Sequence, residues 1–237
     1  MRTCLWEDVS GDLSAIRVLE SATPLVILVD VREALPPFDE PTFSAPERER
    51  ARRFRLDINR REFLAARGVI RSVIASHAAI DPGAVVFEPR GAGKPQLLNP
   101  ECAGIDVSLS HAAGRVACGF QRAGRVGVDI EALDHHEDAD TDAIARRMFS
   151  DAELDALSRS RGAEPRQLFL RAWTRKEAVL KGAGVGLSID PRTFDTLRVS
   201  ETGVKEVSPI RFAGRLWNCR SLSPMPKVEL AVASSTS

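Results

Sequence analysis

Two carboxylates on one short segment are the clearest candidates for chemistry in this sequence. Asp129 and Glu131 stand two residues apart in residues 126–131, which have the pattern of a β-strand. Alternate residues of a strand point to the same face, so both carboxylates are expected side by side. Like charges this close repel unless a cation lies between them, and oxygen ligands at this spacing suit Mg²⁺. A polar strand end that faces water explains the pair at least as well, so both interpretations stay open here.

A third carboxylate lies on a helix predicted over residues 165–181. Trp173, Glu177 and Lys181 recur at a spacing of four, so they share one helix face. A solvated Glu–Lys pair at this spacing is common and stabilises a helix by only about 0.3–0.5 kcal/mol. The tryptophan on the same stripe indicates that this face is at least half buried. A buried carboxylate there needs a metal ion or the lysine as its partner.

Two further segments carry signals for phosphate binding. His111 follows Ser110 at the end of a predicted strand and could donate to a phosphate, although a single histidine is more often structural. Gly93 and Lys94 place a backbone N–H and an ammonium in a loop that a proline stiffens. The Walker pattern, the dinucleotide-binding glycine pattern, His-Glu-x-x-His and Gly-x-Ser-x-Gly are all absent from the sequence. Their absence argues against a P-loop enzyme, a Rossmann enzyme, a zincin and an α/β-hydrolase.

The elements that must position these residues follow a similar order twice along the chain. Capping boxes at residues 44–47 and 150–153 predict helix starts, and a long helix is expected over 60–79. The helix over 165–181 is expected to end at Gly182. The predicted strands are 25–29, 85–88, 105–109, 116–120 and 126–130, then 194–199, 210–212, 216–222 and 228–233.

This repetition predicts an α+β (α/β) fold built from two pseudo-symmetric halves. The boundary between the halves is expected near residue 120, which divides the chain into residues 1–120 and residues 121–237. At roughly 150 residues per domain, the 237 residues allow one or two such units.

The composition is that of a folded protein without net charge. Hydrophobic residues make up 43% and charged residues 28%, and 33 basic residues balance 33 acidic ones. No apolar run approaches the roughly 18 residues of a membrane helix, and the early acidic residues argue against a signal peptide. Four widely separated cysteines form neither a disulfide framework nor a zinc signature. We therefore expect a cytoplasmic protein without a membrane partner.

Charge is nevertheless unevenly distributed along the chain. Residues 48–71 hold nine arginines against three acids, whereas residues 129–142 hold seven acids and neither lysine nor arginine. Such zones suit a polyanion held partly by arginine and partly through a metal ion, although two solvated surfaces would look the same. A nucleic-acid partner is not expected, because only Phe54 and Phe63 interleave the arginines and no nucleic-acid motif is present.

Taken in order, four motifs resemble the 4′-phosphopantetheinyl transferases of the surfactin-synthetase-activating type. They are Gly93-Lys94-Pro95, Ser108-Leu-Ser-His111, Gly127-Val-Asp-Ile-Glu131 and Trp173-Thr-Arg-Lys-Glu-Ala-Val-Leu-Lys181, with Gly184-Val-Gly-Leu187 after them. The resemblance covers about residues 46–187. It implies two similar halves with coenzyme A and the metal site in the cleft between them.

The resemblance also implies roles for individual residues. Asp129, Glu131 and Glu177 would bind Mg²⁺ or Mn²⁺, with Glu131 acting directly or through water. Glu177 would be the general base, with Asp129 and Lys181 as the other catalytic residues. The residue three before Arg50 is Glu47, where the family has a basic residue. The residues implied to contact coenzyme A are Arg50, Arg67, Arg90, Lys94, Ser110, His111, Lys176 and Lys181.

The implied activity is transfer of the phosphopantetheine arm of coenzyme A to a serine of an acyl or peptidyl carrier protein. This is the reaction of the holo-acyl-carrier-protein synthase type, in polyketide, nonribosomal-peptide or specialised lipid biosynthesis. We expect a monomer that meets its carrier transiently. The carrier is expected to dock on Arg146, Arg147 and exposed apolar side chains at Met148 and Phe149, with acidic residues 134–142 turned away.

Three other functions compete with this interpretation. A coenzyme-A-dependent acyltransferase would need no metal, so a chelator separates the two reactions. A nucleic-acid-binding module is disfavoured for the reasons above. An inactive carrier-binding protein is disfavoured because all three acidic residues are present.

Overall fold

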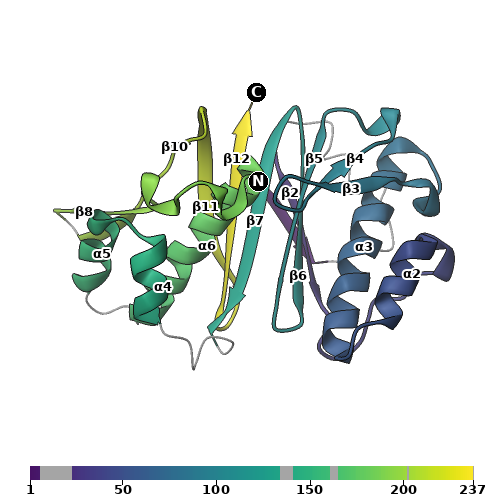
Figure 1. Ribbon diagram of the computed structural model, residues 1–237, viewed down its shortest axis with the longest axis horizontal. Helices are drawn as coiled ribbons and strands as arrows, with labels where there is room; N and C mark the ends of the chain where they lie inside the picture. Colours follow the sequence, from purple (N-terminus) through teal and green to yellow (C-terminus); the bar gives the residue numbers. More distant parts are fainter. Residues whose placement is uncertain (6–22, 134–140, 161–164, 202, 237) are drawn as a thin grey trace.

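Two four-stranded β-sheets stand back to back at the centre of the molecule, and a long helix covers the outer face of each (Figure 1). The computed structural model describes residues 1–5, 23–133, 141–160, 165–201 and 203–236. Within these ranges the sheets, with α3 on one side and α6 on the other, form four layers. The fold is therefore α+β, as the sequence predicts.

The first sheet has the strand order β1-β2-β6-β5. β1 (Arg2–Leu5) runs parallel to β2 (Leu25–Asp30). β6 (Arg115–Arg122) lies antiparallel to both β2 and β5 (Ile105–Ala112). β5 is thus an edge strand of this sheet, and it carries Ser110 and His111.

The second sheet has the order β10-β11-β12-β7 and is antiparallel throughout. Its members are β10 (Ile210–Phe212), β11 (Arg215–Met225), β12 (Val228–Thr236) and β7 (Gly124–Ala132). β7 is its edge strand and carries Asp129 and Glu131. β6 pairs within the first sheet and β7 within the second. We therefore propose the turn between these two strands as the division between the halves.

Two hairpins stand outside the central sheets. One joins β3 (Phe87–Arg90) to β4 (Lys94–Leu97), and the other joins β8 (Leu197–Ser200) to β9 (Gly203–Glu206). The first differs from the sequence expectation of a strand followed by a loop: Lys94 lies on a strand that folds back on its partner.

Five α-helices lie within the described residues. They are α2 (Ala45–Arg52), α3 (Asp57–Ala78), α4 (Thr141–Met148), α5 (Asp151–Ser158) and α6 (Pro165–Ala183). Short 3-10 turns occupy Glu40–Thr42, Pro82–Ala84, Pro100–Cys102, Gly186–Ser188 and Pro191–Thr193. Among the described residues, no helix combines the length and the apolar character that crossing a bilayer requires.

Both predicted capping boxes are confirmed. The Ser44 and Ser150 hydroxyls accept from the backbone N–H groups of Glu47 and Glu153. In return, each glutamate carboxylate accepts from the backbone N–H of its serine. Gly182, in contrast, does not end its helix: α6 continues to Ala183, and the left-handed residue that follows is Gly184 (φ 74°).

Apolar residues alternate along each central strand and so fill three separate layers. On β2, Leu25 and Ile27 pack toward α3, whereas Val26 and Leu28 face the second sheet. β7 behaves the same way, because Val128 lies between the sheets while Asp129 has the opposite orientation. The second sheet also buries residues against α6. The carboxylates of β7 therefore project to the side on which α6 lies.

Candidate active site at the seam between the sheets

The edge strands β5 and β7 lie side by side, joined by side chains of β5; we call this line the seam. The Val126 N–H donates to Asp106 Oδ2 (2.7 Å), and the Val128 N–H donates to Ser108 Oγ (3.1 Å). Ser110 Oγ continues the series by donating to Asp129 Oδ1 (2.9 Å). Unpaired backbone groups along an edge strand are unfavourable. Here alternate polar side chains of β5 accept hydrogen bonds from two of the backbone N–H groups of β7.

Asp129, which accepts the last of these three hydrogen bonds, is almost fully buried, with 2% of its side chain exposed. Lys181 Nζ lies 2.6 Å from Asp129 Oδ1 and 2.8 Å from Ser110 Oγ. Asp129 Oδ2 is buried without a hydrogen-bond partner among the described residues. A buried carboxylate oxygen without a donor is costly, so this atom is suited to hold a cation or a donor that a ligand brings.

Close packing of α6 against β7 brings the charged face of the helix to this carboxylate. A Cβ on Gly127 would lie 1.8 Å from the Ala178 carbonyl oxygen of α6. One on Gly182 would lie 3.2 Å from the Gly127 nitrogen and 2.5 Å from the Trp217 ring of the neighbouring β11. Only residues without side chains allow helix and strand to approach this closely. Glu177 and Lys181 thereby reach the Asp129 side of the seam.

The charges of this cluster act on one another. Burial raises the pKa of Asp129 to about 7; Lys181 opposes that shift, while Glu131 and Glu177 add to it. Burial likewise raises the pKa of Glu177, against the effect of Lys181. Burial alone would lower the pKa of Lys181, but Asp129 and then Glu177 raise it overall. Three carboxylates whose charges act on one another, with Lys181 opposing them, form a site that favours an added cation.

Within the described residues, no three His, Cys, Asp or Glu side chains are already gathered closely enough to hold a metal ion. The residues present nevertheless fit one, because Asp129 Oδ2 has no hydrogen-bond partner among the described residues and two further carboxylates, Glu131 and Glu177, act on Asp129 against one lysine. Lys181 occupies the other oxygen of Asp129 in this structure.

A second group of predicted residues lines a cavity of about 420 Å³ between α3 and the end of β5. Arg50, Arg67 and His111 all border it. Both arginines lie against the Phe63 ring, with guanidinium carbons 5.0 and 5.4 Å from its centroid. Burial lowers the pKa of Arg67 despite the nearby Glu47 carboxylate. Three cationic or cationisable groups in one cavity are suited to an anionic group.

Glu47, found where the resembled family has a basic residue, has a structural role here. Its carboxylate lies 2.8 Å from the buried Arg71 and 3.9 Å from Arg67, besides closing the capping box of α2. It therefore holds two arginines of α3 rather than supplying a positive charge to the cavity.

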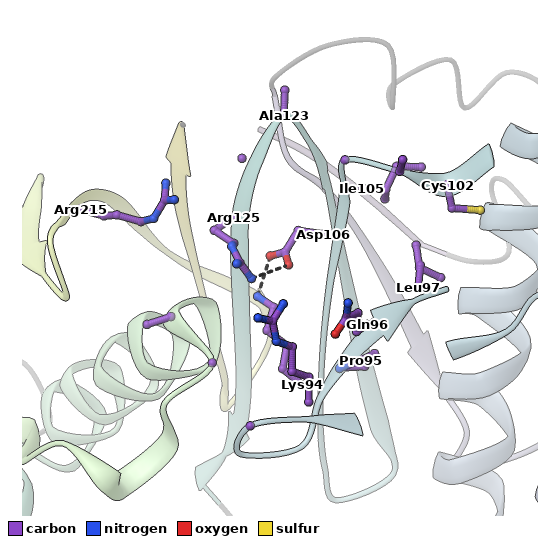
Figure 2. A pocket seen from close by; sticks show the side chains of 17 residues that line it. Lys94, Pro95, Gln96, Leu97, Cys102, Ile105, Asp106, Ala123, Arg125 and Arg215 are labelled. Carbon is purple, nitrogen blue, oxygen red and sulfur yellow. Dashed lines mark hydrogen bonds and ion pairs between the residues drawn. The ribbon is translucent and has the colours of Figure 1, made fainter. Parts of the chain in front are cut away.

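Arg90 and Lys94 line a different cavity, of about 640 Å³, at the far end of the seam (Figure 2). Lys94 Nζ contacts Asp106 Oδ2 (2.6 Å), the Val126 carbonyl (2.6 Å) and the Gly182 carbonyl (3.0 Å). In Figure 2 the ends of Lys94 and Arg125 both point to the Asp106 carboxylate. All three ammonium protons therefore have protein acceptors. The structure does not bring Lys94 to the cavity that holds Arg50 and His111.

The structure corrects the role predicted for Lys176. Its side chain is fully buried on the far side of α6, 2.6 Å from the equally buried Glu153, and it also donates to the carbonyls of Pro191 and Phe194. A phosphate could not reach this ammonium without unfolding the region. Helical spacing could have indicated this separation of Lys176 from Glu177, because neighbouring residues lie about 100° apart around a helix.

The expected carrier-docking surface is also wrong in part. Met148 and Phe149 are buried, with 2% and 1% exposed, and pack in the core beneath α6. They offer no exposed apolar surface, although Arg146 and Arg147 are exposed. Of the acidic stretch, residues 134–140 lie outside the described part of the chain.

Comparison with known proteins decides the family. The chain is 30% identical over 194 residues to the 4′-phosphopantetheinyl transferase HetI of Nostoc sp., which covers 81% of this chain and 78% of HetI. The chain belongs to the 4′-phosphopantetheinyl transferase superfamily. The superfamily model itself matches residues 125–232, which span β7 through most of β12.

A second relative supports this assignment. The chain is 33% identical over 164 residues to the 4′-phosphopantetheinyl transferase psf-1 of Bacillus pumilus, covering 69% of this chain and 67% of psf-1. A solved holo-(acyl-carrier-protein) synthase from Bacillus anthracis, in complex with CoA (3′,5′-ADP), matches 48% of this chain and 96% of its own. Its TM-score is 0.37 and its identity 17%.

Proposed function

We propose that this protein transfers the 4′-phosphopantetheine arm of coenzyme A to a serine of a carrier protein and releases adenosine 3′,5′-bisphosphate. The observation that carries the proposal is the buried Asp129, whose unpartnered oxygen lies in a cluster with Glu177 and Lys181. Membership of the superfamily supplies the reaction class. We also propose that it is an enzyme of the holo-acyl-carrier-protein synthase type, that its carrier belongs to polyketide or nonribosomal-peptide biosynthesis, and that it acts in the cytoplasm as a monomer.

The two groups of residues suit the two ends of the coenzyme A nucleotide. We infer that the 3′-phosphate lies in the cavity lined by Arg50, Arg67 and His111. Ser110, adjacent to His111 on β5, hydrogen-bonds to Asp129, so the same strand connects this cavity to the acidic cluster. The pyrophosphate would then lie beside Lys181, the one ammonium of the cluster.

Asp129, Glu177 and, directly or through water, Glu131 would hold Mg²⁺ or Mn²⁺. When bound, the cation would neutralise charge on the pyrophosphate and orient the in-line displacement.

The protein's own groups would carry the proton and stabilise charge. Because its pKa is raised by burial, Glu177 is suited to accept the proton of the incoming serine hydroxyl near neutral pH. Lys181 stays protonated beside Asp129 and can donate to the phosphate oxygens that gain charge. The new bond joins the serine oxygen to the β-phosphorus, and the bond to the adenosine bisphosphate oxygen breaks.

The direct test is the intact mass of several unrelated apo carrier domains after incubation with coenzyme A, Mg²⁺ and this protein. A mass gain of one phosphopantetheine arm, abolished by a chelator, is expected. Carriers that all keep their apo mass would overturn the proposal. A gain of an acyl group from acyl-coenzyme A without any metal would favour the acyltransferase alternative.

Mg²⁺ is expected to stabilise the protein more at about pH 8 than at about pH 6. With its pKa near 7, Asp129 is largely protonated at the lower pH, so a cation must displace a proton to bind there. The apparent affinity should therefore rise as the pH passes through 7. Thermal unfolding over a Mg²⁺ titration at both pH values measures this. Equal stabilisation at both pH values would contradict the role of Asp129, and Asp129→Asn should lose the effect.

Arg50→Ala and His111→Ala are each expected to weaken binding of coenzyme A more than binding of 3′-dephospho-coenzyme A. Each side chain would give the 3′-phosphate a charge-assisted hydrogen bond worth about 1.5–3 kcal/mol. KM values for the two substrates measure the difference. Arg55→Ala, which removes an exposed arginine beyond the end of α2, is the matched control. Equal losses for both substrates would place these residues elsewhere.

A further inference from the structure

One buried carboxylate borders the cavity of Arg50, Arg67 and His111, and no motif in the sequence points to it. Glu62 lies on α3 with 7% of its side chain exposed. Its Oε2 is 3.1 Å from His111 Nδ1, and its Oε1 accepts from the Gly114 N–H at 2.7 Å. The two carboxylate oxygens thus contact both His111 and the turn that follows it.

A carboxylate in a cavity suited to anions would repel them if its charge were free. Here one oxygen of Glu62 contacts His111 and the other accepts from the Gly114 N–H, and only 7% of the side chain is exposed. The negative charge is therefore balanced by these neighbours and does not face a ligand in the cavity. A side chain with this arrangement acts through its neighbours. The neighbour with a possible ligand contact is His111, which is 52% exposed.

The position of Glu62 is fixed from both sides. On α3, Glu62 and Ala66 lie one turn apart and both line the cavity. On the other side, the Gly114 carbonyl accepts from the Val31 N–H (2.8 Å), which ties the β5–β6 turn to the end of β2. Glu62 therefore joins two rigid elements, and the imidazole is held by its Nδ1 nitrogen.

We propose that Glu62 is a positioning residue that orients the His111 ring toward a phosphate in this cavity. With Nδ1 engaged by Glu62, Nε2 is the ring nitrogen left for a ligand. A half-exposed imidazole without that partner would sample several rotamers and lose part of its contact. Glu62 would thus contribute to the preference for 3′-phosphorylated nucleotides without touching them. This inference rests on the proposed function, which supplies the phosphate.

The test is nucleotide binding, which needs no transfer reaction. Calorimetry would compare adenosine 3′,5′-bisphosphate with adenosine 5′-monophosphate for the wild type, Glu62→Gln, His111→Ala and the double variant. Glu62→Gln is expected to lower affinity for the bisphosphate about tenfold, or about 1.4 kcal/mol, and to leave the monophosphate unchanged. In the His111→Ala background it should cause no further loss.

Glu88→Gln, which removes an exposed carboxylate on β3, is the matched control and should change neither affinity. If Glu62→Gln does not fold, Glu62→Asp keeps the charge while withdrawing it from His111, and it should show the same selective loss. Equal losses for both nucleotides, or a full tenfold loss in the His111→Ala background, would overturn the inference.

Failure of this inference is distinguishable from failure of the proposed function. A wild type that modifies carriers, but whose nucleotide preference survives Glu62→Gln, would remove only the role of Glu62. A wild type that prefers the bisphosphate through Glu62 yet leaves every carrier unmodified would remove only the proposed function.

Discussion

Asp129→Asn is expected to lower kcat/KM for carrier modification by about 100-fold or more. The amide keeps the size of the carboxylate and can still accept from Ser110, so the seam should remain intact. It cannot supply the negative charge that would hold a cation beside Glu177, and effects of this size are typical when a charged group is removed from a reacting centre. Initial rates over a range of carrier concentrations, with Mg²⁺ present, would measure the loss.

Two comparisons make this result specific. Asp155→Asn removes an exposed carboxylate of α5 and should leave the rate unchanged. Glu131→Gln should lose less activity than Asp129→Asn, because Glu131 is only half-buried and could act through water. A rate near that of the wild type for Asp129→Asn would remove the metal assignment from this cluster.

Local pattern was sufficient for the parts of the site that lie within one element. Strand alternation places Asp129 and Glu131 on one side of β7, and helical spacing places Glu177 and Lys181 on one side of α6. Both capping boxes form for the same reason, because their partners are three residues apart. In these cases every interacting group is a near neighbour in sequence.

The parts that sequence could not predict depend on contacts between distant segments. Asp106 and Ser108 satisfy backbone groups of β7 only because the two edge strands come together at this register. Glu62 reaches His111 across 49 residues, since α3 packs over the end of β5. Glycine's role at 127 and 182 likewise appears only when α6 meets β7. Asp106, Glu62 and Gly182 stand in none of the four motifs, and the motifs that contain Ser108 and Gly127 assign neither residue a role.

The role predicted for Lys176 is wrong for a different reason: the family resemblance implied a place at the phosphates, whereas helix geometry turns this residue away from Glu177. It stands beside Glu177 in sequence, and the motif suggested a second lysine at the phosphates. The structure buries it against Glu153, whose other oxygen accepts from the backbone and hydroxyl of Thr196. The same motif thus holds one lysine for the core and one, Lys181, for the acidic cluster.

Lys176→Met is accordingly expected to lower the free energy of unfolding by about 3–5 kcal/mol, because it leaves the Glu153 carboxylate buried and unpaired. Burial lowers the pKa of the Lys176 ammonium, and the nearby Glu153 carboxylate opposes that shift without cancelling it. Urea unfolding would measure the loss. The double variant Lys176→Met, Glu153→Gln should regain part of it, since no uncompensated charge remains and glutamine can still close the capping box.

Lys181→Met is the informative contrast, because it removes the same residue type five positions further along α6. The variant leaves Asp129 buried without its ammonium partner, but burial already raises the pKa of Asp129 to about 7, so this carboxylate can take up a proton. The cost in unfolding free energy should therefore be smaller, whereas kcat/KM should fall sharply. The folded fraction of Lys176→Met should instead keep a kcat/KM within about twofold of the wild type, as expected for a residue away from the reacting atoms. If Lys176→Met kept its stability and lost activity as Lys181→Met does, Lys176 would belong to the phosphate site after all.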